Sequence, residues 1–156
     1  MVTRRQASLF LAGVPAVESM RNRWNPEQAR LIPAHLTLCR EDEISDWDGL
    51  QVKMKSLCPF EIHFAFGAPV RDGNFVYLPI LDGLDSFRKL RRQLLSENAR
   101  NLEPHVTIIH PRNGICTDCI FSEIQQSIQP FGTSIRDVRL IEQVDGGVWR
   151  TFALIA

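Results

Sequence analysis

Two stretches of this chain repeat one pattern about seventy residues apart, and this repeat constrains the fold more than any other feature. The first runs from the apolar residues 10–15 through a segment with helical spacing to His-Leu-Thr-Leu at 35–38. The second runs from residues 77–80 through another such segment to His-Val-Thr-Ile at 105–108. Each stretch is predicted to form a strand, a helix and a strand. A duplicated β-α-β unit of this kind predicts a pseudo-symmetric domain with two lobes.

Hydrophobic periodicity predicts the remaining elements. Apolar residues at helical spacing predict helices over residues 16–24, 44–58, 84–99 and 118–127. Alternating or continuous apolar runs predict strands over residues 8–14, 36–39, 60–66, 75–81, 106–109, 135–144 and 148–155. Asp145-Gly146-Gly147 is a hairpin signal between the last two strands. Because no linker or low-complexity stretch interrupts this order, we expect one compact unit over residues 1–156, of α/β or α+β class.

The net charge of the chain is zero, from 18 Lys+Arg and 18 Asp+Glu. Non-specific binding along nucleic acid depends on many phosphate contacts, so we expect no binding to long DNA. No apolar run approaches the roughly 18 residues that a membrane span needs, so we expect no membrane segment. The four cysteines are too few for a disulfide scaffold, which favours reduced thiols and a cytoplasmic protein. Arg4-Arg5 before an apolar run also resembles a twin-arginine export signal, although the same run suits a first strand better.

The repeated His-x-Thr pattern has a geometric consequence. In a strand, residues i and i+2 point to the same face, so His35 shares a face with Thr37, and His105 with Thr107. The apolar residues between them point the other way, into a core. If the lobes pack around a pseudo-twofold axis, the two His-Thr pairs converge on one cleft. A single His-x-Thr is commonplace as a half-buried polar pair, but two complete copies that each end a β-α-β unit favour a function.

The chemistry of such a cleft follows from its side chains. Two imidazoles of near-neutral pKa can act as general base and general acid on opposite sides of a phosphodiester. Two hydroxyls can donate hydrogen bonds to the non-bridging phosphate oxygens, where charge accumulates in the transition state. This reaction needs neither a metal nor another cofactor, and we expect none here.

The motifs His35-Leu36-Thr37-Leu38 and His105-Val106-Thr107-Ile108 together resemble the signature of the 2H phosphoesterase superfamily. This superfamily includes the LigT-like proteins, also called bacterial 2′-5′ RNA ligase-like proteins or RNA 2′,3′-cyclic phosphodiesterases. The resemblance covers essentially the whole chain and implies an α+β fold of two pseudo-symmetric lobes around a central cleft. It also implies metal-independent hydrolysis, or transfer, at a 2′,3′-cyclic or 2′-linked phosphodiester. By the same resemblance, His35 and His105 form the acid/base pair, and Thr37 and Thr107 bind the phosphate.

Three further residues are candidate substrate contacts. LigT-like proteins often carry an arginine five residues after the second histidine; His110 has that place here, and Arg40 has it in the first motif. Strand parity puts both on the face opposite the histidines, so each reaches the cleft only if its strand bends or ends there. Pro111 makes such an end plausible after His110. Tyr77 lies on the strand that opens the second lobe, where it could stack on a base or ribose, or else pack in the core.

Three other features are interpreted as having no direct part in the chemistry. Cys116-Thr117-Asp118-Cys119 lacks the second ligand pair or thioredoxin-type unit that a zinc or redox role needs. His63 is expected to be solvated on the polar face of its strand. A basic helix face is expected to be solvated, with guidance of RNA as the alternative role; it comprises Arg88, Lys89, Arg91 and Arg92.

Three classes of function remain open from the sequence. The first, which we expect, is a monomeric enzyme that acts on 2′,3′-cyclic phosphates of RNA termini or small cyclic nucleotides. Within that class, ADP-ribose cyclic phosphate and 2′-5′-linked oligonucleotides are alternative substrates, and ligation is an alternative direction. The second class is a module that binds RNA ends or a nucleotide without turnover. The third is a structural or redox protein, which a large separation of His35 from His105 would favour.

Overall fold

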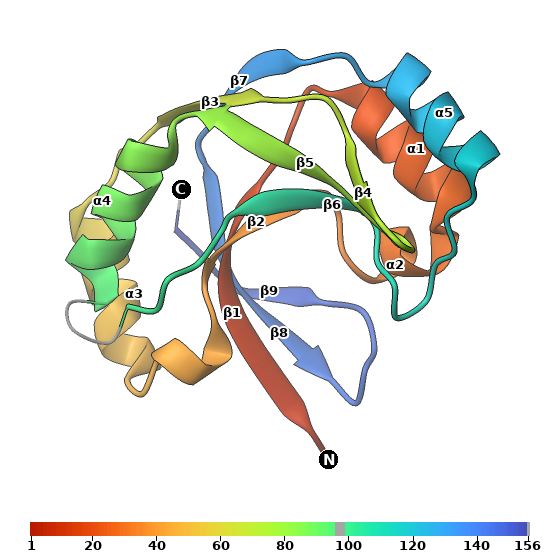
Figure 1. Cartoon of the computed structure of the whole chain (residues 1–156). Coiled ribbons are helices and arrows are strands. Elements are labelled where there is room, and N and C mark those ends of the chain that lie inside the picture. The colour runs from red at the N-terminus through yellow and green to blue at the C-terminus, as the bar shows by residue number, and fades with distance from the viewer. Residues whose placement is uncertain (96–98, 156) are drawn as a thin grey trace.

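The computed structural model describes residues 1–95 and 99–155. The elements follow one another along the chain (Figure 1) in the order β1 (Thr3–Phe10), α1 (Pro15–Trp24), α2 (Pro26–Leu31), β2 (His35–Cys39), the 3-10 helix η1 (Glu41–Glu43), α3 (Trp47–Ser56), β3 (Ile62–Phe66), β4 (Val70–Asp72), β5 (Phe75–Asp82), α4 (Leu84–Leu95), β6 (His105–Ile109), α5 (Asp118–Ser127), β7 (Phe131–Ile135), β8 (Asp137–Val144) and β9 (Arg150–Leu154).

The strands form two antiparallel sheets. One has the order β2-β1-β8-β9, and the other has the order β4-β5-β3-β7, with β6 also paired to β5. The strands with the His-x-Thr motifs are β2 and β6, and each pairs with the strand that opens its own repeat, β2 with β1 and β6 with β5. The duplication predicted from the sequence is therefore present in the strand pairing, and the predicted α+β class is confirmed.

Helices cover the sheets at two ends of the molecule (Figure 1). Helices α1 and α5 contact each other at one end, and α3 and α4 contact each other at the other. Helix α1 packs against β6, and α4 packs against β2. The helix of each repeat thus lies against the motif strand of the other repeat. One apolar cluster, with residues from both sheets and from these helices, fills the space between the two sheets.

The predicted alternation along the motif strands is confirmed. Leu36 and Leu38 are fully buried on β2, and Val106 and Ile108 are buried on β6. The side chains of the intervening histidines and threonines are half-buried on the opposite face. The hairpin at residues 145–147 is also confirmed, because β8 pairs with β9. Asp145 and Gly146 adopt positive φ angles of 49° and 71° there, as such a turn requires.

Some predicted boundaries differ from the structure. The strand expected over 8–14 is β1, which begins at Thr3 because residues 3–7 pair with β8, and which ends at Phe10. The strand expected over 135–144 is divided, because Ile135 ends β7 in one sheet and Asp137 begins β8 in the other. Helix α2 was not expected, since Asn25-Pro26 looks like a stop; the proline instead occupies the first turn of a new helix, where its missing N–H costs nothing. Residues 96–98 of the helix expected over 84–99 lie outside the described residues.

The expectation of a fully solvated basic face on α4 is wrong for Arg91. Its side chain is buried, and its guanidinium pairs with Glu43 at 2.5 Å. The cause is the tertiary position of α4 against β2, which helical periodicity alone does not reveal. Lys89 and Arg92 are exposed, as expected, and Arg88 is half-buried.

The C-x-x-C segment stands at the start of α5. Cys116 is buried and Cys119 is exposed. Between them, the hydroxyl of Thr117 accepts a hydrogen bond from the N–H of Ile120 and caps the helix. Among the described residues, no helix has the length and apolar character to cross a membrane.

Candidate active site

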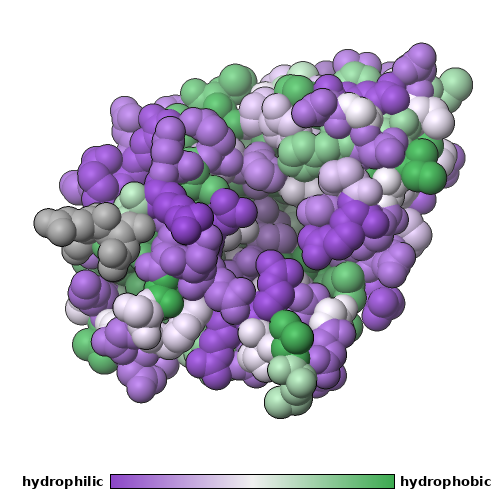
Figure 2. Space-filling view, turned by 60° about the horizontal axis from the view of Figure 1, so that its bottom comes forward, coloured by the Kyte–Doolittle hydropathy of each residue, from purple (hydrophilic) through white to green (hydrophobic). Residues whose placement is uncertain are grey.

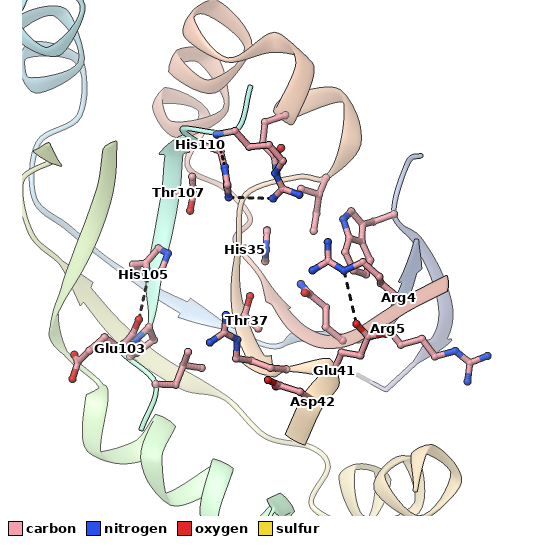
Figure 3. Close-up of a pocket in the computed structure, with 18 of the residues that line it drawn as sticks. Arg4, Arg5, His35, Thr37, Glu41, Asp42, Glu103, His105, Thr107 and His110 are labelled. Carbon is pink, nitrogen blue, oxygen red and sulfur yellow. Dashed lines mark hydrogen bonds and ion pairs between the residues drawn. The ribbon is translucent and has the colours of Figure 1, made fainter. Parts of the chain in front are cut away.

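A cavity of about 480 Å³ lies between the two repeats. Figure 2 shows one face of the molecule hollowed at its centre, with mostly hydrophilic residues around the hollow. The four side chains of the His-x-Thr motifs all line the cavity: His35, Thr37, His105 and Thr107. The structure therefore brings together two motifs that are about seventy residues apart in sequence, as Figure 3 shows.

Each histidine ring is held by the backbone just before its own strand. Nδ1 of His35 lies 2.9 Å from the carbonyl oxygen of Pro33, and Nδ1 of His105 lies 3.0 Å from that of Glu103. A carbonyl oxygen only accepts, so Nδ1 carries the proton and donates it in both bonds. In the neutral ring this leaves the Nε2 lone pair free. Both imidazoles are therefore oriented in the same way, by the carbonyl two residues upstream.

The surroundings of the two imidazoles differ. The ring of His35 packs against Phe10, with centroids 6.0 Å apart. Burial lowers the pKa of His35 to about 4; the hydrogen bond to Pro33 opposes this lowering, and the charges of Arg21 and His105 add to it. His35 is accordingly neutral at neutral pH and able to accept a proton.

The residues five positions after each histidine both line the cavity. Strand β2 ends at Cys39 and β6 ends at Ile109, so Arg40 and His110 lie just after the strands. The alternation of side chains between the two faces of a strand therefore does not apply to them. Burial, and then the charges of Arg112 and His105, lower the pKa of His110. The backbone N–H of Arg112 donates to Nδ1 of His110 at 3.1 Å, so this nitrogen serves as an acceptor.

Comparison with known proteins identifies the family. Residues 10–147 match the 2′-5′ RNA ligase superfamily. This chain belongs to that superfamily. The resemblance indicated by the paired motifs is thereby confirmed, and no curated protein matches the chain.

Solved structures share the fold of this superfamily member. E. coli LigT complexed with 3′-AMP has a TM-score of 0.63 at 15% sequence identity, with 97% of this chain and 96% of that chain covered. E. coli LigT complexed with phosphate has a TM-score of 0.57 at 16% identity, with 99% and 94% covered. The protein TT0787 of Thermus thermophilus has a TM-score of 0.60 at 14% identity, with 97% and 96% covered. At such identities the likeness shows the fold, and the two-lobed LigT-like architecture expected from the sequence is confirmed.

Arg112 is a cavity residue of this superfamily member that the sequence reasoning missed. Its guanidinium Nη2 lies 3.1 Å from Nε2 of His110. The chain turns sharply after β6, where the N–H of Gly114 donates to the carbonyl of His110 at 2.8 Å, and this turn brings Arg112 back over the cavity. The arginine directly after His110-Pro111 was the signal that could have found it.

Tyr77 stands beside the site. It lies opposite Thr107 in the β5–β6 register, and its ring contacts the edge of the His105 ring at a centroid distance of 5.6 Å. Phe75 stacks on Tyr77 at 4.8 Å and also contacts His105. Among the described residues that line the cavity, Tyr77 does not occur. Its geometry is that of a support for His105, and its contact with substrate stays a prediction.

Strand β1 adds polar residues to the rim that the sequence reasoning also missed. Arg4 lies 5.5 Å from the centroid of the Trp149 ring and 3.8 Å from Glu41, while Arg5 pairs with Glu142 at 2.7 Å. Figure 3 shows Arg4 and Arg5 on the side of the cavity opposite His105. The polar start of β1, Thr-Arg-Arg-Gln, was the available signal. It becomes informative only once β1 is known to lie beside β2.

Proposed function

We propose that this protein is a metal-independent cyclic phosphodiesterase that opens the 2′,3′-cyclic phosphate of nucleotides or RNA ends. The observation that carries the proposal is the matched pair of imidazoles. Both line one cavity, and both have Nδ1 bonded to a backbone carbonyl so that Nε2 is free. Paired imidazoles of this kind supply a base and an acid without a metal ion.

Within this proposal we give the role of base to His35, whose pKa is lowered by burial, and the role of acid to His105. Neutral His35 accepts a proton from water through Nε2, and the resulting hydroxide attacks phosphorus. The bond from phosphorus to one ribose oxygen breaks, and His105 acts as the acid that donates a proton from Nε2 to the departing oxygen. The product is a nucleoside 2′- or 3′-monophosphate, and proton exchange with solvent restores both rings. Thr37 and Thr107 donate hydrogen bonds to the non-bridging oxygens as charge builds there.

Cations at the ends of the motif strands suit an anionic substrate. Arg40 follows β2 and Arg112 follows β6, and both line the cavity. A guanidinium binds phosphate oxygens through directed, charge-assisted hydrogen bonds. The complexes of E. coli LigT with 3′-AMP and with phosphate are consistent with a nucleoside monophosphate in a fold of this kind.

The test is hydrolysis of adenosine 2′,3′-cyclic monophosphate by the purified protein in excess EDTA, with products separated by chromatography. We expect turnover with a bell-shaped pH profile. His35→Ala and His105→Ala should each lower kcat by about 10²- to 10⁴-fold. His63→Ala is the matched control, because His63 is exposed on β3 and bonded to Ser134, outside the cavity, and it should leave kcat unchanged. Full activity in both cavity variants would falsify the proposal.

The same assay separates the alternative substrates. ADP-ribose cyclic phosphate and a 2′-5′-linked oligonucleotide replace the cyclic nucleotide in parallel reactions, and ligation is read from the reverse reaction. Tight binding of the cyclic nucleotide with no product after long incubation would support a binding module instead. We further propose a cytoplasmic monomer, which agrees with four free cysteines, and light scattering in solution tests the monomer.

A further inference from the structure

The duplication extends to a pair of buried arginines. Arg21 lies on α1 and Arg91 on α4, at the same seventy-residue offset that relates His35 to His105. Their exposed fractions are 2% and 3%. Each forms an ion pair with a glutamate, Arg21 with Glu18 at 3.1 Å and Arg91 with Glu43 at 2.5 Å.

Arg21 contacts β6 and the segment that leads into β2. Its Nη2 donates to the carbonyl of Ile32 at 2.8 Å, just before β2, and its Nε donates to the carbonyl of Thr107 at 3.1 Å on β6. Glu18 accepts a hydrogen bond from the N–H of Ala34 at 2.5 Å. One Arg-Glu pair thus joins the backbone that carries His35 to the backbone that carries Thr107.

Arg91 makes the corresponding contacts at the other end of β2. Its Nη1 donates to the carbonyl of Leu38 at 2.6 Å, and its Nη2 donates to the carbonyl of Arg100 at 2.9 Å. Glu43 accepts the backbone N–H groups of Arg40 and Arg100 at 2.9 and 2.8 Å. This pair joins the end of β2 to the segment that leads into β6. Arg21 lines the cavity, whereas Arg91 is not among the described residues that do so.

We propose that Arg21 is a positioning residue of the active site, which sets the separation of the two motif strands from inside the cavity. Arg91 is its counterpart from the duplication and joins the end of β2 to the segment that leads into β6. The proposal rests on the proposed function for its kinetic consequences, since a displacement of about 1 Å in a reacting group can cost 10²-fold in rate. Arg21 itself transfers no proton.

The position of Arg21 also has an electrostatic consequence for His35. Among the described residues, Arg21 from α1 and His105 from β6 are the charged or titratable groups that act on His35, and Phe10 from β1 is its apolar neighbour. The positive charge of Arg21 disfavours a second positive charge on His35. Loss of that charge should raise the pKa of His35 and move the acidic limb of the kcat/KM profile to higher pH, because this limb reports the base of the free enzyme.

The experiment compares Arg21→Gln with the matched variant Arg91→Gln. Both should lower the unfolding midpoint in urea, because each removes a buried ion pair. For Arg21→Gln we expect kcat to fall by about 10- to 100-fold with little change in KM, together with the shift of the acidic limb. For Arg91→Gln we expect the acidic limb to stay in place. Arg21→Lys keeps the charge but loses the forked hydrogen bonds. Its acidic limb should therefore lie at the wild-type pH, while its kcat should stay low.

A second readout separates this inference from the proposed function. The titration of His35 followed by NMR in the wild type and in Arg21→Gln needs no turnover. If the wild type hydrolyses no cyclic nucleotide, the proposed function fails while this titration still tests Arg21. If Arg21→Gln fails to fold, Arg21→Lys supplies the kcat comparison. The inference is overturned if folded Arg21 variants keep wild-type kcat and an unchanged His35 titration, or if Arg91→Gln shifts the acidic limb equally.

Discussion

At the scale of single residues, the carbonyl two positions before each histidine decides what the imidazole can do. The carbonyls of Pro33 and Glu103 hold Nδ1 of His35 and His105, so Nε2 is the unprotonated nitrogen of each neutral ring. Burial lowers the pKa of His35, because a charged imidazole loses hydration there. Under the proposed function, the environment of His35 within this repeated backbone arrangement suits it to act as base, with His105 as acid.

The lowered pKa of His35 predicts a specific dependence of stability on pH. The unfolded histidine has a pKa of about 6.5, and the folded one has a pKa of about 4. Between these values the unfolded state binds more protons, so His35 makes the free energy of unfolding decrease as pH falls from about 6.5 to 4. In His35→Gln, urea unfolding across this range should show a weaker decrease than in the wild type. His63→Gln, on the exposed face of β3, controls for removal of an imidazole; an equal slope in wild type and His35→Gln would contradict the prediction.

At the scale of elements, the turn between β5 and α4 places the second helix on the motif strand of the first repeat. Gly83 forms this turn with φ of +100°, a conformation that favours glycine. Its backbone lies close to the carbonyl of His63 and the side chain of Phe64, so a Cβ would clash with both. The N–H of Phe87 donates to the Gly83 carbonyl at 3.0 Å and starts the helix that carries Arg91.

We therefore expect Gly83→Ala to be costly. The left-handed conformation costs an alanine about 1 kcal/mol, and the clash with β3 adds about 1–3 kcal/mol to the loss in unfolding free energy. Gly73→Ala is the matched control, because Gly73 has φ of +60° and no heavy atom within 4 Å of the added Cβ. Urea unfolding of both variants measures the difference. Equal losses would show that the approach of Gly83 to β3 is unimportant.

At the scale of the whole molecule, the C-terminal strands join the two sheets. Strand β7 pairs with β3 in one sheet, and β8 then lies between β1 and β9 in the other. The apolar cluster between the sheets includes Leu9 and Leu140 from the first sheet and Phe64 and Leu78 from the second. Because neither sheet is complete without the last part of the chain, we expect the chain to unfold as one cooperative unit.

This expectation has a direct measurement. Trp24, Trp47 and Trp149 report on distant parts of the molecule, so urea unfolding followed by tryptophan fluorescence should coincide with unfolding followed by far-ultraviolet circular dichroism. A fragment that ends at Ser127 lacks β7, β8 and β9 and should show no cooperative transition. Separate transitions by the two probes, or a cooperatively folded fragment, would contradict the prediction of a single unit.

Features that depend on interactions between residues close in sequence were predictable, and features that depend on partners far away in sequence were not. Alternation along residues 35–38 and 105–108 is local, so it predicted correctly which of these side chains are buried and which face the cavity side. The glycines of the last hairpin are local signals in the same way. By contrast, Ile135 and Val138 belong to different sheets although both look like parts of one apolar run, because their partners β3 and β1 are far away in sequence.

The sequence by itself determined the repeat, the parity of its motif strands and the membership of the family, because these depend on neighbouring residues and on motif spacing. Only the tertiary structure decided that Arg21 and Arg91 are buried and that Arg112 returns to the cavity. The physical reason is that a buried guanidinium needs several acceptors at once. For Arg21 these are Glu18, Ile32 and Thr107, which meet at one place only after the two repeats have packed together.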